Sequence, residues 1–333
     1  MSSDKTLDNP AATTGTLLVS IIVSTYRRSD MLHDALKSLR QLAVRDGLAY
    51  EVLVVDNDSA CSAHAVVESV RPEWHDSAAL RYISETRPGL VCVRNRGIDE
   101  SRGDIISFLD DDIFIDENWL LEIVDCFART GADCVGARTV IRWEGEPEAS
   151  VLACENELVQ SNRGGGEFEF RGAAVPGGGN MAVRRELVAE GFRFVEELGR
   201  IGTVLLSGED TEAIRRIRAA GKRIWYCGRA VMHHRTGGQR LKASYYVRRA
   251  YWFGISYALV DRKLCGKWYQ IVAGLARLAK VMLVAIPSWL LAKIRRDPAA
   301  NLLLRAFLAR QAGYLHATFR PHKLIPEAMR SKG

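Results

Sequence analysis

Residues 105–112 read IISFLDDD, a short apolar run that ends in three consecutive aspartates. An apolar run of this length, rich in β-branched and aromatic residues, is typical of a buried strand. Residues 17–25 (LLVSIIVST), 51–55 and 80–84 are similar runs, and a longer amphipathic stretch follows each of them. This alternation predicts βα units, and therefore an α/β fold with a mainly parallel sheet flanked by helices.

The carboxyl ends of these strands carry the first candidates for a functional site. Helices are expected over residues 30–42, 60–70, 91–101 and 117–130, and a further strand over 133–139. In an open α/β sheet, ligands bind beyond the carboxyl ends of the strands, where loops and helix N-termini converge. The polar residues at these ends are Thr25, Tyr26, Arg27, Asp56, Asp110, Asp111 and Asp112. We expect them to share one edge of the sheet.

The three adjacent aspartates predict a bound cation. Neighbouring carboxylates repel one another and raise one another's pKa, so a positive charge is expected beside them. Hard divalent cations such as Mg²⁺ or Mn²⁺ are often held by one or two carboxylates and the phosphates of a substrate. The alternative is a solvated acidic turn that caps the helix beginning near Glu117, although a cap needs only one aspartate.

The charges of the 333-residue chain divide into two regions. With 47% hydrophobic and 26% charged residues, the chain is expected to bury a core, and a disordered scaffold is excluded. Residues 240–333 contain 18 basic and 3 acidic residues, whereas residues 1–239 contain 28 basic and 37 acidic ones. The net charge of +6 therefore averages an acidic body and a basic tail, which predicts different partners for the two parts.

The cysteines and the first residues indicate where the chain acts. The seven cysteines form no C-x-x-C pair, which argues against a zinc ribbon, a redox motif or a disulfide framework. A reducing cytoplasm is therefore the expected setting. Residues 1–16 are small and polar, lack the layout of a signal peptide, and predict a disordered lead-in.

Four segments, in their order and spacing, resemble the family 2 glycosyltransferases. They are residues 19–28 (VSIIVSTYRR), 54–59 (VVDNDS), 94–112 (RNRGIDESRGDIISFLDDD) and 207–210 (SGED). The resemblance covers residues 17–240 and is greatest to bacterial exopolysaccharide glucosyltransferases of the succinoglycan type. It implies a GT-A (Rossmann-like) catalytic domain that transfers a sugar, with inversion, from a nucleoside diphosphate sugar to an acceptor hydroxyl.

The resemblance also implies roles for the residues at the strand ends. Asp110 and Asp112 would form the D-x-D element, with Asp112 as the direct metal ligand and Asp110 or Asp111 facing the ribose. Asp56 would hydrogen-bond the uracil. Thr25, Tyr26 and Arg27 would enclose the base, and Arg94 would lie near the nucleotide. Asn57 stands where many relatives have a second aspartate, which leaves the role of that position open.

Glu209 and Asp210 precede a stretch, residues 211–220, that is expected to be helical. By the resemblance, Asp210 is the general base that takes the proton of the acceptor hydroxyl, and Glu209 orients it or contacts the acceptor. The alternative is that the two carboxylates only cap the helix, because its dipole favours negative charge at the N-terminus.

Two further motifs remain ambiguous. Residues 177–182 (GGGNMA) fit a dinucleotide-binding pattern but lie too late in the chain, so Gly179 and Asn180 are assigned to the donor sugar, with a flexible turn as the alternative. His233, in a V-M-H sequence that resembles the family's V-x-H, is expected to complete the metal site in preference to His234, and an imidazole suits Mn²⁺ at least as well as Mg²⁺. The alternative is a surface histidine pair. Residues 143–171 are a candidate acceptor loop.

The basic tail, residues 241–333, is expected to be helical and to bind an anionic membrane surface. Aromatic and basic residues alternate over residues 245–263, which would also suit single-stranded nucleic acid. Residues 271–292 are apolar except for Arg277 and Lys280, and two central cations argue against a membrane span and for an interfacial helix. The alternative is a helical subdomain packed on the catalytic domain, or a homodimer through these helices.

The sequence therefore predicts a metal-dependent glycosyltransferase, peripherally attached to the cytoplasmic face of the plasma membrane. The resemblance favours UDP-glucose or another UDP-linked hexose as donor, and a lipid-linked oligosaccharide or other oligosaccharide as acceptor. Nucleic acid is not expected as a partner. A sugar nucleotidyltransferase would need a glycine- and lysine-rich loop after the first strand, where residues 25–30 have neither. A non-catalytic polysaccharide-assembly subunit would not need Asp112, Asp210 and His233 together.

Overall fold

The computed structural model describes residues 16–74, 78–155, 162–172, 174–200, 204–285, 287–288 and 297–320. All of the predicted disordered lead-in except Thr16 lies outside the described residues. The same holds for residues 321–333 and for much of the second half of the apolar stretch 271–292.

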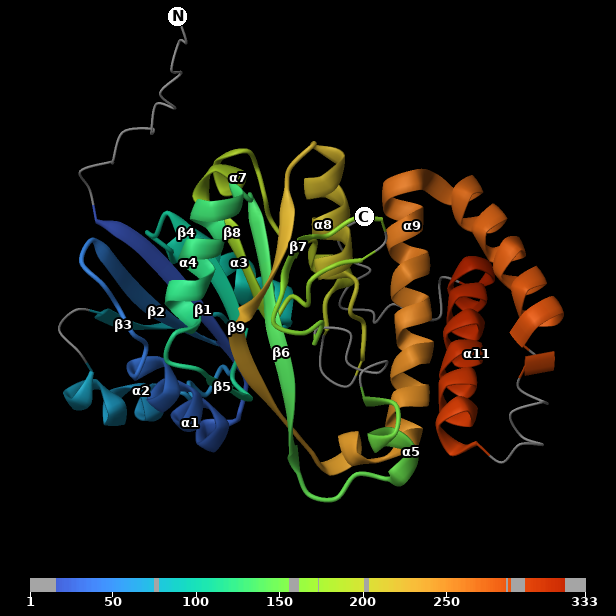
Figure 1. Cartoon of the computed structure of the whole chain (residues 1–333), viewed down its shortest axis with the longest axis horizontal. Coiled ribbons are helices and arrows are strands. Elements are labelled where there is room, and N and C mark those ends of the chain that lie inside the picture. Colours follow the sequence, from blue (N-terminus) through green and yellow to red (C-terminus); the bar gives the residue numbers. More distant parts are fainter. Residues whose placement is uncertain are drawn as a thin grey trace, which may run out of the picture.

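Nine strands of the described chain form one sheet (Figure 1). They are β1 (Leu17–Thr25), β2 (Leu48–Asp56), β3 (Ala78–Ser84), β4 (Ile105–Asp110), β5 (Ile113–Ile115), β6 (Cys134–Glu144), β7 (Glu167–Glu169), β8 (Asn180–Arg184) and β9 (Ile224–Gly237). The helices are α1 (Ser29–Arg40), α2 (His64–Val70), α3 (Leu90–Glu100), α4 (Trp119–Thr130), α5 (Ala149–Leu152), α7 (Arg185–Ala189), α8 (Glu209–Ala219), α9 (Ala243–Lys280) and α11 (Pro298–Phe319). Short 3₁₀ or π turns cover Arg71–Glu73, Glu196–Leu198, Gly238–Leu241 and Val281–Ala285.

The sheet is mixed, with a parallel half that the sequence predicted. Its order is β3-β2-β1-β4-β8-β6-β9-β5, with β7 pairing β9 off this path. Strands β3, β2, β1 and β4 are parallel, while β8 is antiparallel to both β4 and β6. The register sets Thr25 opposite Asp56 and Ser24 opposite Asp110, so the carboxyl ends of β1, β2 and β4 form one edge. The expected α/β sheet with its shared edge is confirmed.

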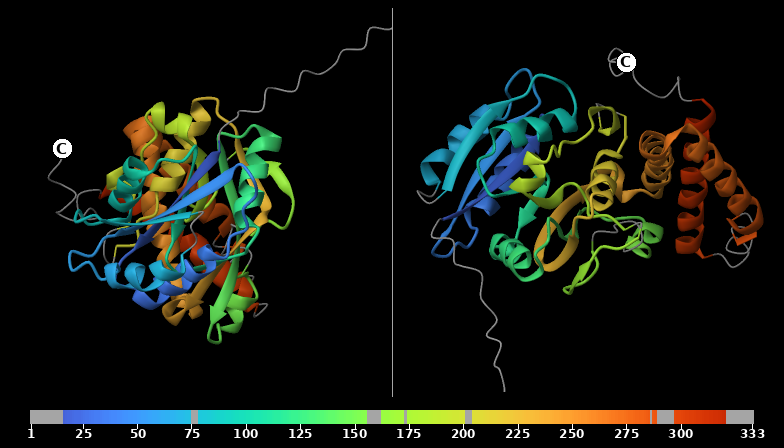
Figure 2. Two further views of the ribbon diagram at one scale, coloured as in Figure 1. Left: turned by 90° about the vertical axis from the view of Figure 1, so that its left-hand side faces the viewer. Right: turned by 90° about the horizontal axis from the view of Figure 1, so that it is seen from above.

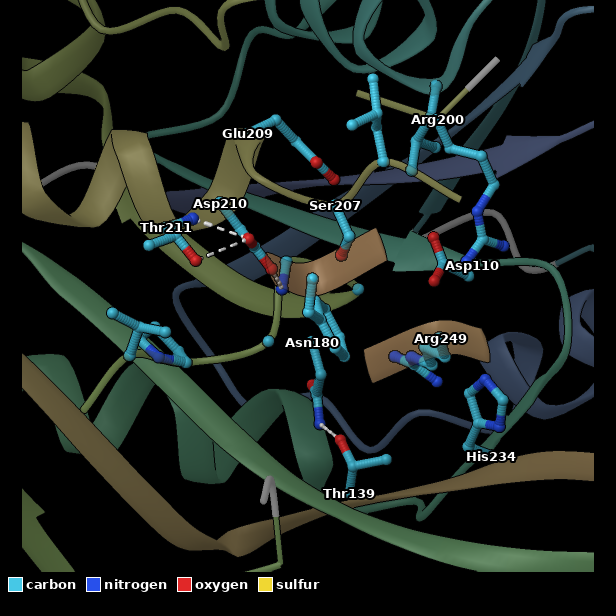
Figure 3. Close-up of a pocket in the computed structure, with 18 of the residues that line it drawn as sticks. Asp110, Thr139, Asn180, Arg200, Ser207, Glu209, Asp210, Thr211, His234 and Arg249 are labelled. Carbon is cyan, nitrogen blue, oxygen red and sulfur yellow. Dashed lines mark hydrogen bonds between the residues drawn. The ribbon is translucent and has the colours of Figure 1, made fainter. Parts of the chain in front are cut away.

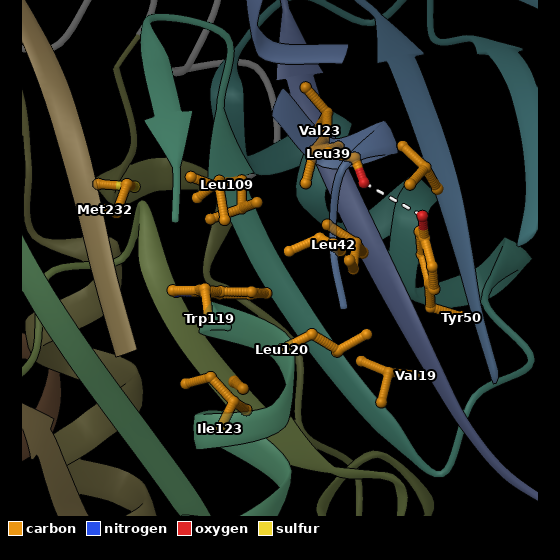
Figure 4. Close-up of a cluster of buried hydrophobic side chains, with 14 of the residues drawn as sticks. Val19, Val23, Leu39, Leu42, Tyr50, Leu109, Trp119, Leu120, Ile123 and Met232 are labelled. Carbon is orange, nitrogen blue, oxygen red and sulfur yellow. Dashed lines mark hydrogen bonds between the residues drawn. The ribbon is translucent and has the colours of Figure 1, made fainter. Parts of the chain in front are cut away.

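Both faces of the parallel half are buried, because alternate residues of each strand enter different cores. Val19, Ile21 and Val23 of β1 pack in one cluster with α1 and α4, and Ile22 packs in the other with residues of α3 and α8. In the first cluster, the Tyr50 hydroxyl donates a 3.1 Å hydrogen bond to the carbonyl oxygen of Leu39 (Figure 4). This burial explains why the strands read as continuous apolar runs.

Helices α9 and α11 stand beside the sheet and pack closely on each other (Figures 1 and 2). Helix α9 changes direction at Gly266, whose φ of 86° is a left-handed conformation that favours glycine. A Cβ atom on Gly254 would lie 1.9 Å from the Arg310 carbonyl oxygen, and one on Gly313 would lie 1.9 Å from that of Tyr251. The two backbones are therefore in contact, and this contact fixes α11 against the first half of α9.

The C-terminal region contains the expected helices, α9 and α11. Among the described residues, none of the helices combines the length and the apolar character that crossing a bilayer requires. The face of α9 beyond Gly266 is nevertheless strongly exposed and apolar, with Trp268 80% and Val272 63% accessible.

Candidate active site

A cavity of about 360 Å³ lies between the carboxyl edge of the sheet and the helices α9 and α11. Its sheet side is formed by Asp110, Asn180, the glycines of residues 177–179 and the start of α8. Figure 3 shows Asp110, Asp210, His234 and Arg249 around this space. Residues that the sequence assigned to separate motifs therefore meet at one cavity.

The three aspartates have different surroundings. Asp110 ends β4 and lines the cavity, whereas Asp111 is buried and accepts hydrogen bonds from the Thr25 hydroxyl and from Arg28, both at 2.9 Å. Burial raises the pKa of Asp111 to about 6, although the positive charge of Arg28 opposes the rise. Thr25 thus supports the aspartate cluster from the neighbouring strand, and Asp111 is held inside the protein.

Asp112 faces His234. The Nε2 atom of His234 lies 3.3 Å from Oδ1 of Asp112, and this Oδ1 is buried without a hydrogen bond. Its Oδ2 lies 3.2 Å from an Arg28 nitrogen and 3.4 Å from an Arg240 nitrogen. Burial would raise the pKa of Asp112, but His234, Arg240 and Arg28 hold it below its usual value. Burial lowers the pKa of His234, which favours the neutral imidazole that a metal ion requires.

His233, which the sequence favoured as the ligand, lies on the other side of β9. Its Nε2 is 3.0 Å from Oδ1 of Asp116, away from Asp112. Successive side chains of a strand point to opposite faces, so only one of the two histidines can reach the aspartates. The structure brings His234 to that position, and the expectation for His233 is replaced by one for His234.

Asp56 lies at the same sheet edge but has several protein partners. Its Oδ1 accepts from the Asp58 N–H and its Oδ2 from the Ala63 N–H, each at 2.9 Å, and the Tyr82 hydroxyl lies 3.2 Å from Oδ2. A carboxylate oxygen can accept two hydrogen bonds, so Oδ1 keeps capacity for one more. Asp56 is nevertheless fully buried and does not line the cavity, so in this structure its carboxylate orders its own loop.

Tyr26 and Arg27 form the outer part of this edge. The guanidinium of Arg27 stacks on the ring of Tyr26 at 5.1 Å and its Nε lies 3.1 Å from Oδ1 of Asp58. Tyr26 is half exposed, and Arg27 has a positive φ of 52°. The two residues follow Thr25 directly in the chain, and the half-exposed Tyr26 ring is accessible to a ligand.

Arg94 joins the two acidic motifs. Its buried guanidinium lies 3.3 Å from Oδ1 of Asp110 and 3.2 Å from Oε1 of Glu209. Burial and the charge of Asp210 raise the pKa of Glu209 to about 7, against the attraction of Arg94. Arg94 thus links Asp110, at the end of β4, to Glu209, at the start of α8.

Asp210 lies in the first turn of α8 and lines the cavity. Its Oδ2 accepts from the Gly178 N–H at 3.2 Å and its Oδ1 from the Thr211 N–H at 2.6 Å. Burial raises its pKa, and Arg94 and these backbone donors oppose the rise. A carboxylate with a raised pKa at a cavity wall is a candidate proton acceptor.

The glycine run approaches these carboxylates closely. A Cβ atom on Gly179 would lie 2.4 Å from Oδ2 of Asp110, and one on Gly178 would lie 2.8 Å from Arg94. The following Asn180 lines the cavity, but its Nδ2 donates to the Arg138 carbonyl at 3.0 Å and to the Thr139 hydroxyl at 3.2 Å. The glycines are thus needed for close approach, and Asn180 is held by protein partners.

The sequence missed one wall of the cavity. Helices α9 and α11 contribute Tyr246, Arg249, Phe253, Tyr257, Ala306 and Arg310. The sequence favoured a membrane surface for the amphipathic faces of these helices, with packing on the catalytic domain as the alternative, because a pattern does not say which surface each face contacts. Of the described part of residues 143–171, the expected acceptor loop, none lines the cavity.

Comparison with known proteins places this site in context. The sequence model described as "Glycosyl transferase family 2" matches residues 20–192. The chain is 29% identical over 237 residues to the succinoglycan biosynthesis protein ExoM of Rhizobium meliloti, covering 71% of this chain and 72% of that protein. It is 24% identical over 257 residues to the glucosyl-dolichyl phosphate glucuronosyltransferase of Haloferax volcanii, covering 73% of this chain and 77% of that protein. Among solved structures, the mannosyltransferase PcManGT of Pyrobaculum calidifontis, in complex with GDP-Man and Mn²⁺, aligns with a TM-score of 0.56 at 20% identity, covering 90% of this chain and 85% of that one.

Proposed function

This chain belongs to glycosyl transferase family 2, and from that premise we propose that it transfers a hexose, with inversion, from a UDP-sugar to a lipid-linked oligosaccharide. It is a glycosyltransferase with the GT-A type of sheet, related to enzymes of exopolysaccharide and glycan synthesis. The observation that carries the proposal is the convergence of Asp110, Arg94, Glu209 and Asp210 on one cavity.

In the proposed reaction, Asp210 is the general base. Its carboxylate takes the proton of the acceptor hydroxyl as the hydroxyl oxygen attacks the anomeric carbon of the donor sugar. The bond from that carbon to the diphosphate oxygen breaks, and the nucleoside diphosphate leaves with the electron pair. The Gly178 and Thr211 N–H groups orient Asp210 for this step. Arg94 and Glu209 are positioning residues, since they hold Asp110 and the start of α8 together.

A divalent cation fits the residues beside Asp112. The buried Oδ1 of Asp112, which accepts no hydrogen bond, and the adjacent Nε2 of His234 are an oxygen and a nitrogen ligand of the kind that Mn²⁺ accepts. We assign the metal to Asp112 and His234, with Asp110 as a further candidate ligand. A bound Mn²⁺ or Mg²⁺ would neutralise charge on the departing diphosphate. The Mn²⁺ in the PcManGT complex supports a divalent cation in this fold.

The donor is the part of the proposal that one experiment tests most directly. With Mn²⁺ present, we expect UDP-glucose, or another UDP-hexose, to bind more tightly and to release its nucleotide faster than GDP- or ADP-sugars do. The expectation rests on the family resemblance, by which Asp56, Tyr26 and Arg27 would hold a uracil ring, and on their position at the shared edge of the sheet. Binding is measured by calorimetry and nucleotide release by a phosphatase-coupled assay, with EDTA as the control. Equal binding of all nucleotide sugars would contradict the proposed donor.

The exposed face of α9 is proposed to attach the enzyme to the cytoplasmic face of an anionic membrane. Trp268, Val272 and Leu275 are exposed, and cationic Lys263 and Lys267 lie close by in the sequence. Apolar side chains with flanking cations are typical of an interfacial helix. We therefore expect the full chain to float with liposomes that contain phosphatidylglycerol, and the triple variant Trp268→Ser, Val272→Ser, Leu275→Ser to remain in the pellet fraction.

The matched control changes exposed apolar residues elsewhere. Val44 and Leu152 are also exposed, and the double variant Val44→Ser, Leu152→Ser is expected to float as the unmodified chain does. Equal flotation of the triple variant would defeat the membrane assignment. If the unmodified chain did not float but was a dimer by light scattering, and the triple variant was a monomer, the same face would instead be assigned to a homodimer contact.

A further inference from the structure

The helical wall of the cavity carries arginines whose charge the described residues do not neutralise. On the sheet side, the carboxylates are paired with Arg28, Arg94 and Arg240. Arg249 of α9, Arg310 of α11 and Arg200 also line the cavity. No salt bridge joins any of these three to a carboxylate in the described part of the chain.

Arg249 lies among other cations. Its guanidinium stacks on Phe253 at 5.0 Å and points into the cavity near His234 (Figure 3). Burial lowers the pKa of Arg249, and Arg240 and Arg200 lower it further, while Tyr245 and Tyr246 oppose the shift. Like charges this close to one another are unfavourable unless an anion lies between them.

Arg310 is held at the same cavity by the helix contact. Its carbonyl packs against Gly254, and its Nε atom is buried without a hydrogen-bond partner. A buried guanidinium N–H without an acceptor is costly, and a ligand oxygen would remove that cost. On the same helix Arg305 is exposed and does not line the cavity.

This wall lies next to the segment that carries the general base. The Ser207 N–H donates to the Ser256 hydroxyl of α9 at 3.0 Å, and Gly208 packs against Val260. Arg310 packs on Gly254, two residues before Ser256 in α9. An acceptor whose hydroxyl reaches Asp210 would therefore pass along the face that carries Arg310 and Arg249.

We propose that Arg249 and Arg310 form a subsite for a phosphate or diphosphate group of the acceptor, beside the proposed donor and metal site at Asp112 and His234. This inference rests on the proposed function and names the chemical class of the acceptor. Guanidinium groups bind phosphate through paired, charge-assisted hydrogen bonds, and Phe253, Tyr257 and Ala306 supply an apolar surround. Both helices lie outside residues 20–192, the part that the family model matches.

The test titrates farnesyl diphosphate into the full chain saturated with UDP and Mn²⁺, followed by calorimetry. We expect farnesyl diphosphate to bind, and Arg249→Gln and Arg310→Gln each to weaken it by about tenfold or more, as for the loss of one or two charge-assisted hydrogen bonds. The matched controls are the exposed neighbours Arg248→Gln and Arg305→Gln, expected to bind within about twofold of the unmodified chain, since each change leaves the cavity wall intact. UDP affinity, measured on every variant, reports whether the fold and the donor site persist.

Two further ligands separate the sources of the anion. If inorganic pyrophosphate binds and is weakened by Arg249→Gln and Arg310→Gln as farnesyl diphosphate is, the subsite is supported, and the lipid chain contributes little to the affinity. Binding of farnesol as tight as that of farnesyl diphosphate would overturn the proposed subsite. So would a result in which Arg249→Gln and Arg310→Gln lose UDP affinity while their affinity for farnesyl diphosphate is unchanged. A chain that binds no UDP-sugar would refute the proposed function, and the same titrations carried out without UDP would still judge the anion subsite.

Discussion

Asp210→Asn is expected to lower the turnover number for sugar transfer by about a thousandfold, while the affinity for the UDP-sugar stays within about twofold of normal. The amide cannot accept the hydroxyl proton, yet it can keep the hydrogen bonds from the Gly178 and Thr211 N–H groups. Single-turnover transfer and calorimetric donor binding, measured on the same preparation, check the two halves of the expectation.

The pH dependence gives an independent readout of the same group. Burial raises the pKa of Asp210, so its protonated, inactive form persists to higher pH than for an ordinary aspartate. The value of kcat/KM should therefore rise with pH through this raised pKa, and the residual activity of Asp210→Asn should lack that limb. Asp116→Asn changes an aspartate outside the cavity and is the control. Near-normal turnover of Asp210→Asn would remove Asp210 from the mechanism.

The second large effect concerns the metal. Asp112→Asn is expected to weaken Mn²⁺ binding to the UDP-loaded chain by about a hundredfold or more, and His234→Gln by about ten- to a hundredfold. Asp112 provides the buried charge, and His234 a neutral nitrogen whose Nε2 lies beside it. Electron paramagnetic resonance of free Mn²⁺ during titration measures binding without relying on activity.

The two adjacent histidines supply their own control. His233→Gln alters the neighbouring position on the opposite face of β9, beside Asp116, and should leave Mn²⁺ affinity within about twofold. If His233→Gln weakened Mn²⁺ binding and His234→Gln did not, the assignment made from the structure would be reversed in favour of the one made from the sequence.

The histidine assignment shows what the sequence could and could not predict. The V-M-H spacing located the segment, but which residue faces the aspartates depends on strand register, since a shift of one residue reverses the faces. In β9 the pairing with β6 jumps from Cys227 to Val231, so the residues between them form an irregularity. No periodicity of the chain predicts that jump.

The buried parallel strands were predictable from the sequence, because their apolar runs are long and the segments that follow them are polar. Of the strands that complete the sheet, β6 was predicted over residues 133–139, but β8, with its antiparallel pairing to β4 and β6, was not. Strand β8 follows a glycine-rich segment whose path depends on tertiary contacts, here the approach of Gly179 to Asp110. Family membership decides between the classes considered from the sequence: the protein is a glycosyltransferase, and the nucleotidyltransferase and non-catalytic alternatives are set aside.

The cavity has one wall from the sheet and one from α9 and α11, and this construction has an evolutionary consequence. The side that would hold the donor comes from residues within 20–192 and from β9, whereas the other side comes from helices that follow β9 in the chain. On the proposed assignment of donor and acceptor to the two walls, mutation or recombination in the last third of the gene is expected to change which acceptor is extended without changing which sugar is added. A chimaera that exchanges these helices between family members is expected to inherit its choice of acceptor from their source.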